Sequence, residues 1–237
     1  MRTRTSYSCQ VATTEERTRL SRETVVDGAL ALAGAEGRDG LTIRRLATHL
    51  GVTPMALYWH FKNKEELLDA LADRLWSLVD TDVDPSRPWP ERLRALMESL
   101  VSVLDAHSEV APLVMTARLE SAHACFDTME VALEVLIEGG FTPPEASAIC
   151  RHGLRTATAL AIGDPDLKPQ LTSAETAERV RQKRIAIETL PAERYPRLIE
   201  AAASFATIED PKAYFDFGID LFVAGVEALA SRRSRSA

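Results

Sequence analysis

Residues 42–61 read TIRRLATHLGVTPMALYWHF, and this stretch decides the fold. Thr42 and Thr53 are residues that begin helices, because a threonine hydroxyl accepts a hydrogen bond from a free N–H group of the first turn. Pro54 suits the first helical position, where a missing N–H costs nothing. Gly51 suits a left-handed residue that ends the preceding helix. The stretch therefore predicts two short helices joined by a glycine turn, with the dimensions of a helix-turn-helix.

Helix signals continue on both sides of this stretch. Ser21 begins a first helix that the glycine segment 37–40 ends, and Asn63 begins a fourth helix that runs to about Val79. Apolar residues recur at spacings of three and four almost everywhere, without the period-two alternation of strands. After a linker at residues 82–90, the pattern and its proline and glycine breaks predict helices at about 90–106, 109–119, 121–138, 142–163, 173–188, 191–204 and 210–231.

These signals predict an all-α protein with an N-terminal three-helix head, which contains the helix-turn-helix, and a larger helical C-terminal domain. We expect the head at residues 20–66 and the C-terminal domain at residues 67–231. The polar segment 1–19 and residues 232–237 are expected to be mobile tails.

Composition limits the class of protein. Of the 237 residues, 46% are hydrophobic and 27% are charged, which excludes wholesale disorder and fibrous repeats. No apolar stretch reaches the ~18 residues of a membrane span, and no signal peptide is visible, so we expect a cytoplasmic protein without a membrane partner. The three cysteines, Cys9, Cys125 and Cys150, form no CxxC pair, which favours reduced thiols over a disulfide framework or a zinc ribbon.

Charge is unevenly distributed along the chain. The net charge is −7, yet residues 1–64 carry 10 Lys and Arg against 6 Asp and Glu, whereas residues 65–237 carry 18 against 29. Because phosphate contacts depend on the local potential, this asymmetry permits DNA binding by the head alone.

The second short helix has an outward face suited to the major groove. The face offers a hydroxyl, apolar contacts for thymine methyl groups, a phenol and a ring N–H, from Thr53, Pro54, Met55, Tyr58 and His60. A corner of two short helices can also be purely structural, so this pattern alone leaves both interpretations open. Trp59 points about 100° around the helix from Tyr58 and is expected to pack inside.

Two of the predicted helices, 142–163 and 210–231, are apolar on more than one face. Wide apolar stripes on terminal helices commonly meet a copy of themselves, which predicts a homodimer through a four-helix contact. The candidate interface residues are Ile149, Leu160, Phe215, Ile219, Phe222, Val223 and Val226. The alternative is that both helices fill the core of one subunit.

A longer stretch, LSRETVVDGALALAGAEGRDGLTIRRLATHLGVTPMALYWHFKNKEELLDALADRLW at residues 20–76, resembles the DNA-binding head of the tetracycline-repressor (TetR) family. The strongest signature is LYWHFKNKEELLDAL. FDTMEVALEVLIEGGFTPPEASAI at 126–149 and FDFGIDLFVAGVEAL at 215–229 resemble the tetracycline-repressor type of C-terminal domain. The resemblance implies a homodimer that binds a palindromic operator in double-stranded DNA, usually as a repressor, and releases it when a small molecule enters the C-terminal domain.

The resemblance also implies DNA contacts. Arg44 would read guanine, because its fork suits O6 and N7. Since the family's well-studied member has polar residues where this chain has Pro54 and Ala56, its operator sequence is not transferred. Arg2 and Arg4 either reach a minor groove or belong to a solvated tail. The implied set places Thr42 and Lys64 at phosphates, Arg44, Thr53, Pro54 and Met55 at base edges, and Tyr58 and His60 at the opposite backbone.

On the ligand side, the family's known inducer can be compared with the sequence. The tetracycline repressor holds tetracycline and magnesium with two histidines and a glutamate, where the alignment here has Asp80, Val114 and Gly163. That inducer and a metal are therefore not expected. We expect an apolar pocket for an unidentified effector, although each candidate can equally be a core residue. The lining candidates are Trp76, Met97, Leu100, Leu104, Met115, Leu119, Phe126 and Met129, with His107 and Arg155 as polar anchors.

Two further alternatives stay open. In the first, the DNA-binding dimer is an activator, or a protein partner controls its DNA binding instead of a small molecule. A metal-dependent enzyme would use His123 with Cys125 or Cys150 with His152, but residues two apart diverge by ~200° around a helix and cannot chelate from one face. No GxSxG, HExxH, P-loop or Rossmann pattern occurs, so we predict neither an enzyme nor a cofactor.

Overall fold

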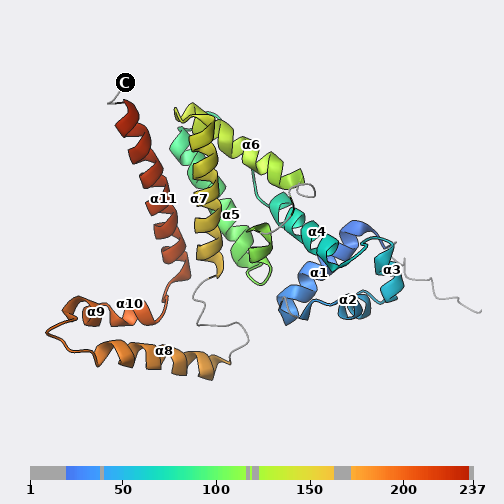
Figure 1. The fold of residues 1–237 in the computed structure, drawn as a ribbon, viewed down its shortest axis with the longest axis horizontal. Helices are drawn as coiled ribbons and strands as arrows, with labels where there is room; N and C mark the ends of the chain where they lie inside the picture. Colours follow the sequence, from blue (N-terminus) through green and yellow to red (C-terminus); the bar gives the residue numbers. More distant parts are fainter. Residues whose placement is uncertain (1–19, 38–39, 116–117, 119–122, 163–171, 235–237) are drawn as a thin grey trace, which may run out of the picture.

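The computed structural model describes residues 20–37, 40–115, 118, 123–162 and 172–234, and its helices are drawn in Figure 1. Every regular element in these ranges is helical, as predicted. The α-helices are α1 (Arg22–Glu36), α2 (Ile43–His49), α3 (Pro54–Tyr58), α4 (Lys64–Ser77), α5 (Trp89–Ala106), α6 (His123–Glu138), α7 (Pro143–Ile162), α8 (Ser173–Glu188), α9 (Pro196–Glu200), α10 (Ala202–Ala206) and α11 (Pro211–Ser234), and the 3-10 helix η2 spans Ala111–Met115. None of the described helices is long and apolar enough to cross a membrane.

Four side chains cap the N-termini of α1, α2, α3 and α4, as predicted. Each accepts a hydrogen bond from the backbone N–H three residues further on: Ser21 at 3.1 Å, Thr42 at 3.2 Å, Thr53 at 3.3 Å and Asn63 at 2.8 Å. A cap of this kind stabilises a helix by ~1 kcal/mol. Gly51 has a φ of 65°, which confirms the left-handed residue predicted between α2 and α3.

The core of the head lies where α1, α2, α3 and the start of α4 meet. Leu46, Leu57 and Phe61 are buried in one cluster that continues into α1 and α4. Full burial of each such side chain stabilises the fold by ~1.5–3 kcal/mol. Gly28 allows α2 to approach α1, since a Cβ at Gly28 would lie 2.6 Å from Cδ2 of Leu50. The two short helices are therefore fixed on a supporting scaffold.

The body of the molecule is built around α5 and α7, which pack along each other. Helices α6 and α11 both contact this pair, and Figure 1 shows them on opposite sides of it. Helices α8, α9 and α10 contact one another and form an arm at the lower left of the view. Helix α4 leaves the head and contacts α6 and η2 of the body.

Two predicted helices are shorter than expected. In place of a helix at 109–119, the described residues form only η2, which contains Pro112, a residue that cannot donate a backbone hydrogen bond. In place of one helix at 191–204, there are two short helices, α9 and α10, which are divided at Ala201. Pro196 is the first residue of α9, a position where its missing N–H costs nothing.

The residues predicted for the dimer interface lie inside the subunit. Helix α11 turns one face toward α5 and α7, so these side chains contact the core of their own chain: Ile149, Leu160, Ile219, Val223 and Val226 are buried, and Phe215 and Phe222 pack against them. The close fit of α11 on α7 is visible at Gly218, where a Cβ would lie 2.7 Å from Cδ2 of Leu160. In the single subunit these side chains pack against their own chain, and Phe215 and Phe222 stay partly exposed.

Candidate nucleic-acid interface and effector pocket

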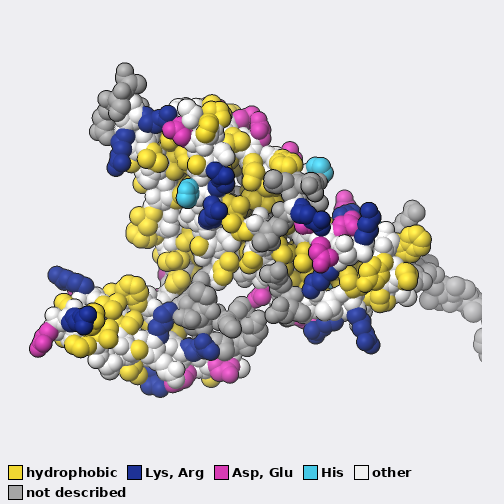
Figure 2. Space-filling view, in the orientation of Figure 1, with side chains coloured by type: hydrophobic (Ala, Val, Ile, Leu, Met, Phe, Trp, Pro, Cys, Tyr) yellow, Lys and Arg dark blue, Asp and Glu magenta, His cyan; other side chains and the backbone are white. Residues whose placement is uncertain are grey.

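One face of helix α3 is buried against the core, and the opposite face exposes both polar and apolar side chains. Leu57 and Phe61 anchor its inner side, and Thr53, Pro54, Met55 and Tyr58 are exposed on the other, Met55 at 67%. Figure 2 shows hydrophobic side chains gathered over α3 at the right of the view, with Lys and Arg side chains beside them. The structure thus brings four of the predicted contact residues onto one accessible surface.

Trp59 is an exception to the prediction, because it does not pack inside. Its side chain is 84% exposed. Helix α3 ends at Tyr58, and the space beneath it is filled by Leu57 and Phe61, so the indole has no place in the core. Trp59 therefore adds an aromatic ring to the outward surface, a residue that helical periodicity alone misses because the helix stops before it.

The basic residues near α3 differ in their surroundings. Thr42, Arg44 and Lys64 are exposed at the starts of α2 and α4. Within the described residues, no carboxylate lies within ion-pair distance of Arg44, whereas Nε of its neighbour Arg45 lies 2.9 Å from Oε2 of Glu36. Arg44 is therefore the cation of this pair that is available to a base or a phosphate.

The segment between α3 and α4 is held by a network of hydrogen bonds. His60 is half-buried, and its carbonyl oxygen accepts a hydrogen bond of 2.7 Å from Nη1 of Arg22. The same nitrogen donates to Oε1 of Glu66 at 3.0 Å, and the backbone N–H of Lys62 donates to Oε2 of Glu66 at 2.9 Å. The Lys62 N–H and then the Arg22 guanidinium lower the pKa of Glu66. The network holds the segment between α3 and α4 against the start of α1.

Helix α4 joins the head to the body through charged side chains. Nε of Arg74 donates to Asp27 of α1 at 2.9 Å. On the other side, Asp73 accepts from the backbone N–H of Ala124 at the start of α6 at 2.9 Å, and the buried Asp69 accepts from Nε of Arg118 at 3.0 Å. Helix α4 is therefore bonded both to α1 of the head and to the body.

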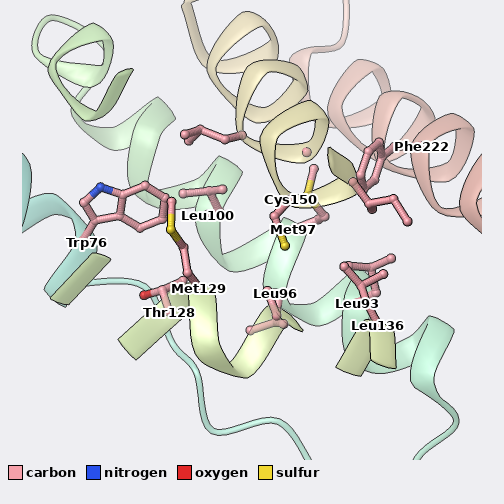
Figure 3. A pocket seen from close by; sticks show the side chains of 14 residues that line it. Trp76, Leu93, Leu96, Met97, Leu100, Thr128, Met129, Leu136, Cys150 and Phe222 are labelled. Atoms are coloured by element: carbon pink, nitrogen blue, oxygen red, sulfur yellow. The ribbon is translucent and has the colours of Figure 1, made fainter. Parts of the chain in front are cut away.

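An apolar pocket lies where α4, α5, α6, α7 and α11 meet (Figure 3). Trp76 of α4 stands at one end and Phe222 of α11 at the other, with Met97 and Met129 between them. The space open to the centre of a water-sized sphere is ≈ 60 Å³. Drug-sized ligands occupy pockets of ~300–1,000 Å³, so a ligand of that size must displace lining side chains.

Of the predicted lining residues, the structure brings four into this pocket: Trp76, Met97, Leu100 and Met129. Leu104 is buried elsewhere in the core, and Met115, Phe126 and Arg155 are exposed. His107 borders a different, more open hollow beside Arg74. Leu119 lies outside the described residues.

Ten lining residues were not predicted for the pocket. They are Leu93, Leu96, Thr128, Ala132, Leu136, Ile149, Cys150, Gly153, Leu154 and Phe222. Most are ordinary core types, whose sequence pattern is the same in a pocket and in a filled core. The one usable signal is on α7, where Cys150 and Gly153 place small residues three apart on a helix that is otherwise suited to tight packing.

The arrangement of the side chains gives no support to the alternative of a metal-dependent enzyme. In the described part of the chain, no three His, Cys, Asp or Glu side chains come together as metal ligands. Burial raises the pKa of the Cys125 and Cys150 thiols to about 11, so both are neutral at pH 7. Asp80 is exposed and Val114 is buried in η2, and neither lines the pocket; Gly163 lies outside the described residues.

Comparison with known proteins agrees with this arrangement. Residues 25–71 match the family of bacterial regulatory proteins called tetR, and residues 83–230 match the tetracyclin repressor-like C-terminal domain. The chain is 31% identical to the class C tetracycline repressor protein of Escherichia coli, over 89% of this chain and 92% of the relative. It is 30% identical to the transcriptional repressor DrrR1 of Streptomyces coeruleorubidus, over 92% of this chain and 82% of the relative.

A solved structure gives the same result for the fold. The TetR family protein ActR of Streptomyces coelicolor, in complex with actinorhodin, superimposes with a TM-score of 0.74 and 27% identity, over 90% of this chain and 99% of ActR. Sequence and structure agree from the head to the last helix, and the chain belongs to the tetR family of bacterial transcriptional regulators, with a tetracycline repressor-like C-terminal domain.

Proposed function

We propose that this protein is a homodimeric repressor that binds a palindromic operator and releases it when a small molecule fills the pocket between Trp76 and Phe222. The observation that carries the proposal is the course of α4. Its first residue, Lys64, is next to the outward surface of the head, and Trp76 in its last turn lines the pocket. One rigid element thus connects the two places where the proposed ligands bind.

The DNA contacts proposed are those on the outward surface of the head. Arg44 reads a base edge, and Thr53, Pro54 and Met55 face the major groove. Thr42, Tyr58, His60 and Lys64 contact the backbone and set the orientation of α3. All of these residues are exposed except the half-buried His60, and this exposure, together with the basic balance of residues 1–64, supports the proposal. A protein with this role acts in the cytoplasm, where the operator lies.

The second copy is proposed to pack on the outward face of α11. Phe217 and Leu221, one turn apart, are 62% and 61% exposed, and Tyr214 is exposed on the same face. Large apolar side chains in such a row mark an interface, and a two-fold axis pairs the row with itself. The pairing presents two heads to one duplex, as a palindromic operator requires.

The small volume of the pocket is proposed to be the cause of release, because a ligand has to move the lining side chains to enter it. A ligand that moves Trp76 or its neighbours shifts α4, and the hydrogen bonds of Asp73 and the ion pair of Arg74 pass the shift to α6 and α1. Each ~1.4 kcal/mol by which the ligand prefers the shifted state changes the equilibrium tenfold. The naming of relatives as tetracycline repressors, and the actinorhodin bound to ActR, support a response to small molecules.

The test is a compound screen with two readouts on the full chain. Thermal shift finds the compounds that bind, and gel shift on an operator selected from random duplexes finds those that release DNA. We expect at least one stabilising compound to lower operator affinity, and Trp76→Ala to reduce that response more than operator binding itself. If every stabilising compound leaves operator affinity unchanged, induction by a small molecule is refuted.

A further inference from the structure

The lining of the pocket between Trp76 and Phe222 contains no charged side chain. Its heteroatoms are the hydroxyl of Thr128, the thiol of Cys150, the thioethers of Met97 and Met129, and the indole nitrogen of Trp76. This short inventory limits what a ligand can find in the site: there is no carboxylate, ammonium, guanidinium or imidazole to pair with an ion.

The two heteroatoms other than sulfur are already occupied or turned away. The Thr128 hydroxyl donates to the carbonyl oxygen of Ala124, one turn back on the same helix, at 3.0 Å. In Figure 3, the six-membered ring of Trp76 points toward Met129 and Leu100, and the indole nitrogen lies on the opposite side of the ring. A ligand in the pocket therefore meets the carbon face of the indole and not its donor.

The remaining heteroatoms are sulfurs, which are soft and weakly polar. Met97 and Met129 come from α5 and α6, and Cys150 from α7, so sulfur borders the pocket on three helices. Burial raises the pKa of the Cys150 thiol to about 11, which keeps it uncharged. Sulfur makes favourable contacts with aromatic rings, and the flexible methionine side chains can rearrange around a ring of variable outline.

We propose that the effector is an uncharged, mainly hydrocarbon molecule with an aromatic ring, which binds between Trp76 and Phe222 without an ionic or metal-mediated anchor. This inference rests on the proposed function, because it names the chemical class of the effector. An ion entering the pocket would lose its hydration without gaining a partner, whereas an apolar ring gains dispersion contacts in a space where water has few hydrogen-bond partners.

Gly153 controls the width of the pocket near Phe222. A Cβ at this position would lie 3.1 Å from Cζ of Phe222 and 3.3 Å from Sδ of Met97. The missing side chain thus leaves room at the point where α5, α7 and α11 converge. Gly34 of α1 is a matched control, because a Cβ there meets no atom within 4 Å.

The first experiment compares three probes that share a two-ring skeleton: naphthalene, 2-naphthoate and decalin. Binding to the full chain is measured at pH 7.4 by titration calorimetry and thermal shift. We expect naphthalene to bind at least tenfold more tightly than 2-naphthoate, and more tightly than decalin. If 2-naphthoate binds as tightly as naphthalene or more tightly, the pocket has an ionic anchor and the proposal is wrong. If decalin binds as tightly as naphthalene, the pocket has no preference for an aromatic ring and the proposal is also wrong.

The second experiment locates the probe with substitutions. We expect Gly153→Ala and Leu100→Phe each to weaken naphthalene binding at least fivefold, Gly34→Ala to leave it unchanged, and Thr128→Val to change it by less than twofold. A large loss in Thr128→Val would reveal a polar anchor. Unchanged binding in both Gly153→Ala and Leu100→Phe would place the probe elsewhere. Either result overturns the proposal. Gly153→Ala and Leu100→Phe both reduce the volume of the pocket, so the test still works if one of them does not fold.

Operator release is scored separately, so that the two proposals can fail independently. If 2-naphthoate releases the operator and naphthalene does not, the chemical class is wrong and the proposed function stands. If naphthalene binds as expected but neither it nor any other bound compound releases the operator, the chemistry of the pocket stands and the proposed function falls.

Discussion

The guanidinium of Arg22 lies 4.2 Å from the centroid of the Phe61 ring. Arg22 is the first residue of α1, and Phe61 follows α3, so the contact ties the start of the head to the segment that leads into α4. Because the same side chain also donates to the carbonyl oxygen of His60, one arginine fixes both the ring and the backbone beside the outward surface.

Arg22→Ala is expected to weaken operator binding about five- to tenfold, with unchanged helix content. The reason is positional: the segment after α3 loses its cation–π contact and its hydrogen bonds, worth ~1 kcal/mol in an exposed setting. Fluorescence anisotropy with labelled operator measures the change. Arg87→Ala is the control, since Arg87 pairs with Asp84 and Glu91 in the body. Equal affinities for Arg22→Ala and the control would remove the positional role.

Arg44→Ala and Arg45→Ala form a matched pair. Arg44 is available to a base, so its loss is expected to cost ~1–3 kcal/mol of operator binding and to relax the base preference at one position. Arg45 is paired with Glu36, and its removal is expected to change affinity less. Binding-site selection from random duplexes measures both effects. A stronger loss of sequence preference in Arg45→Ala would reverse the assignment.

Trp59→Ala and Phe61→Ala test the outward position of Trp59. An exposed side chain contributes little to the core, so Trp59→Ala is expected to change the free energy of unfolding by about 0.5 kcal/mol or less. Phe61 is buried, and Phe61→Ala is expected to cost ~3–5 kcal/mol. Urea denaturation followed by circular dichroism gives both numbers. A comparable cost for the two variants would mean that Trp59 packs inside after all.

Leu221→Asp is expected to convert dimers to monomers at micromolar concentration. A carboxylate in the middle of the exposed row on α11 would be buried without a partner at a two-fold contact. Light scattering coupled to gel filtration measures the mass. Ile137→Asp, at a similarly exposed apolar position on α6, is the control and should keep the mass of the parent protein. An intact dimer in Leu221→Asp would move the interface to another face.

The lowered pKa of Glu145 predicts that the free energy of unfolding decreases in acid. Hydrogen bonds from the Thr142 hydroxyl, the Arg233 side chain and the Thr142 backbone lower the pKa of Glu145 to about 2. A carboxyl group whose pKa is lowered on folding stabilises the protein above its ordinary pKa near 4.5, and that contribution is lost as the pH falls from there toward 2. Glu145 joins the start of α7 to the end of α11 through Arg233.

Glu145→Gln should therefore be less stable than the parent protein at pH 7, and the difference should shrink as the pH falls from about 5 to 2. Thermal denaturation across this range measures the two curves. Parallel curves for the parent protein and the variant would show that Glu145 has the same pKa in the folded and unfolded chain.

The sequence was most informative where structure depends on a few neighbouring residues. The caps at Ser21, Thr42, Thr53 and Asn63 and the turn at Gly51 were predicted because each needs only a side chain and the next three or four backbone groups. The outward face of α3 followed from the same local geometry up to Tyr58. Trp59, which is exposed, and His60, which is half-buried, both departed from the prediction, since periodicity does not show where a helix of five residues ends.

The sequence could not predict which of two equally apolar helix faces packs against the core. Helix α11 is apolar around much of its circumference, so its pattern does not say whether Phe222 or Leu221 faces the subunit core; the packing on α5 and α7 decides it. The pocket presents the same difficulty. Leu104 and Leu100 have the same chemistry and lie one turn apart, yet only Leu100 borders the pocket.

Helix α11 has a consequence for dosage in the cell. Phe222 on its inner side borders the pocket, while Phe217 and Leu221 on its outer side are proposed to meet the second copy. By reciprocity, a molecule that loosens the pairing must bind separated chains more tightly, and by the same factor. A bacterium that holds few copies of the regulator would then respond to a lower intracellular concentration of the signal than one that holds many.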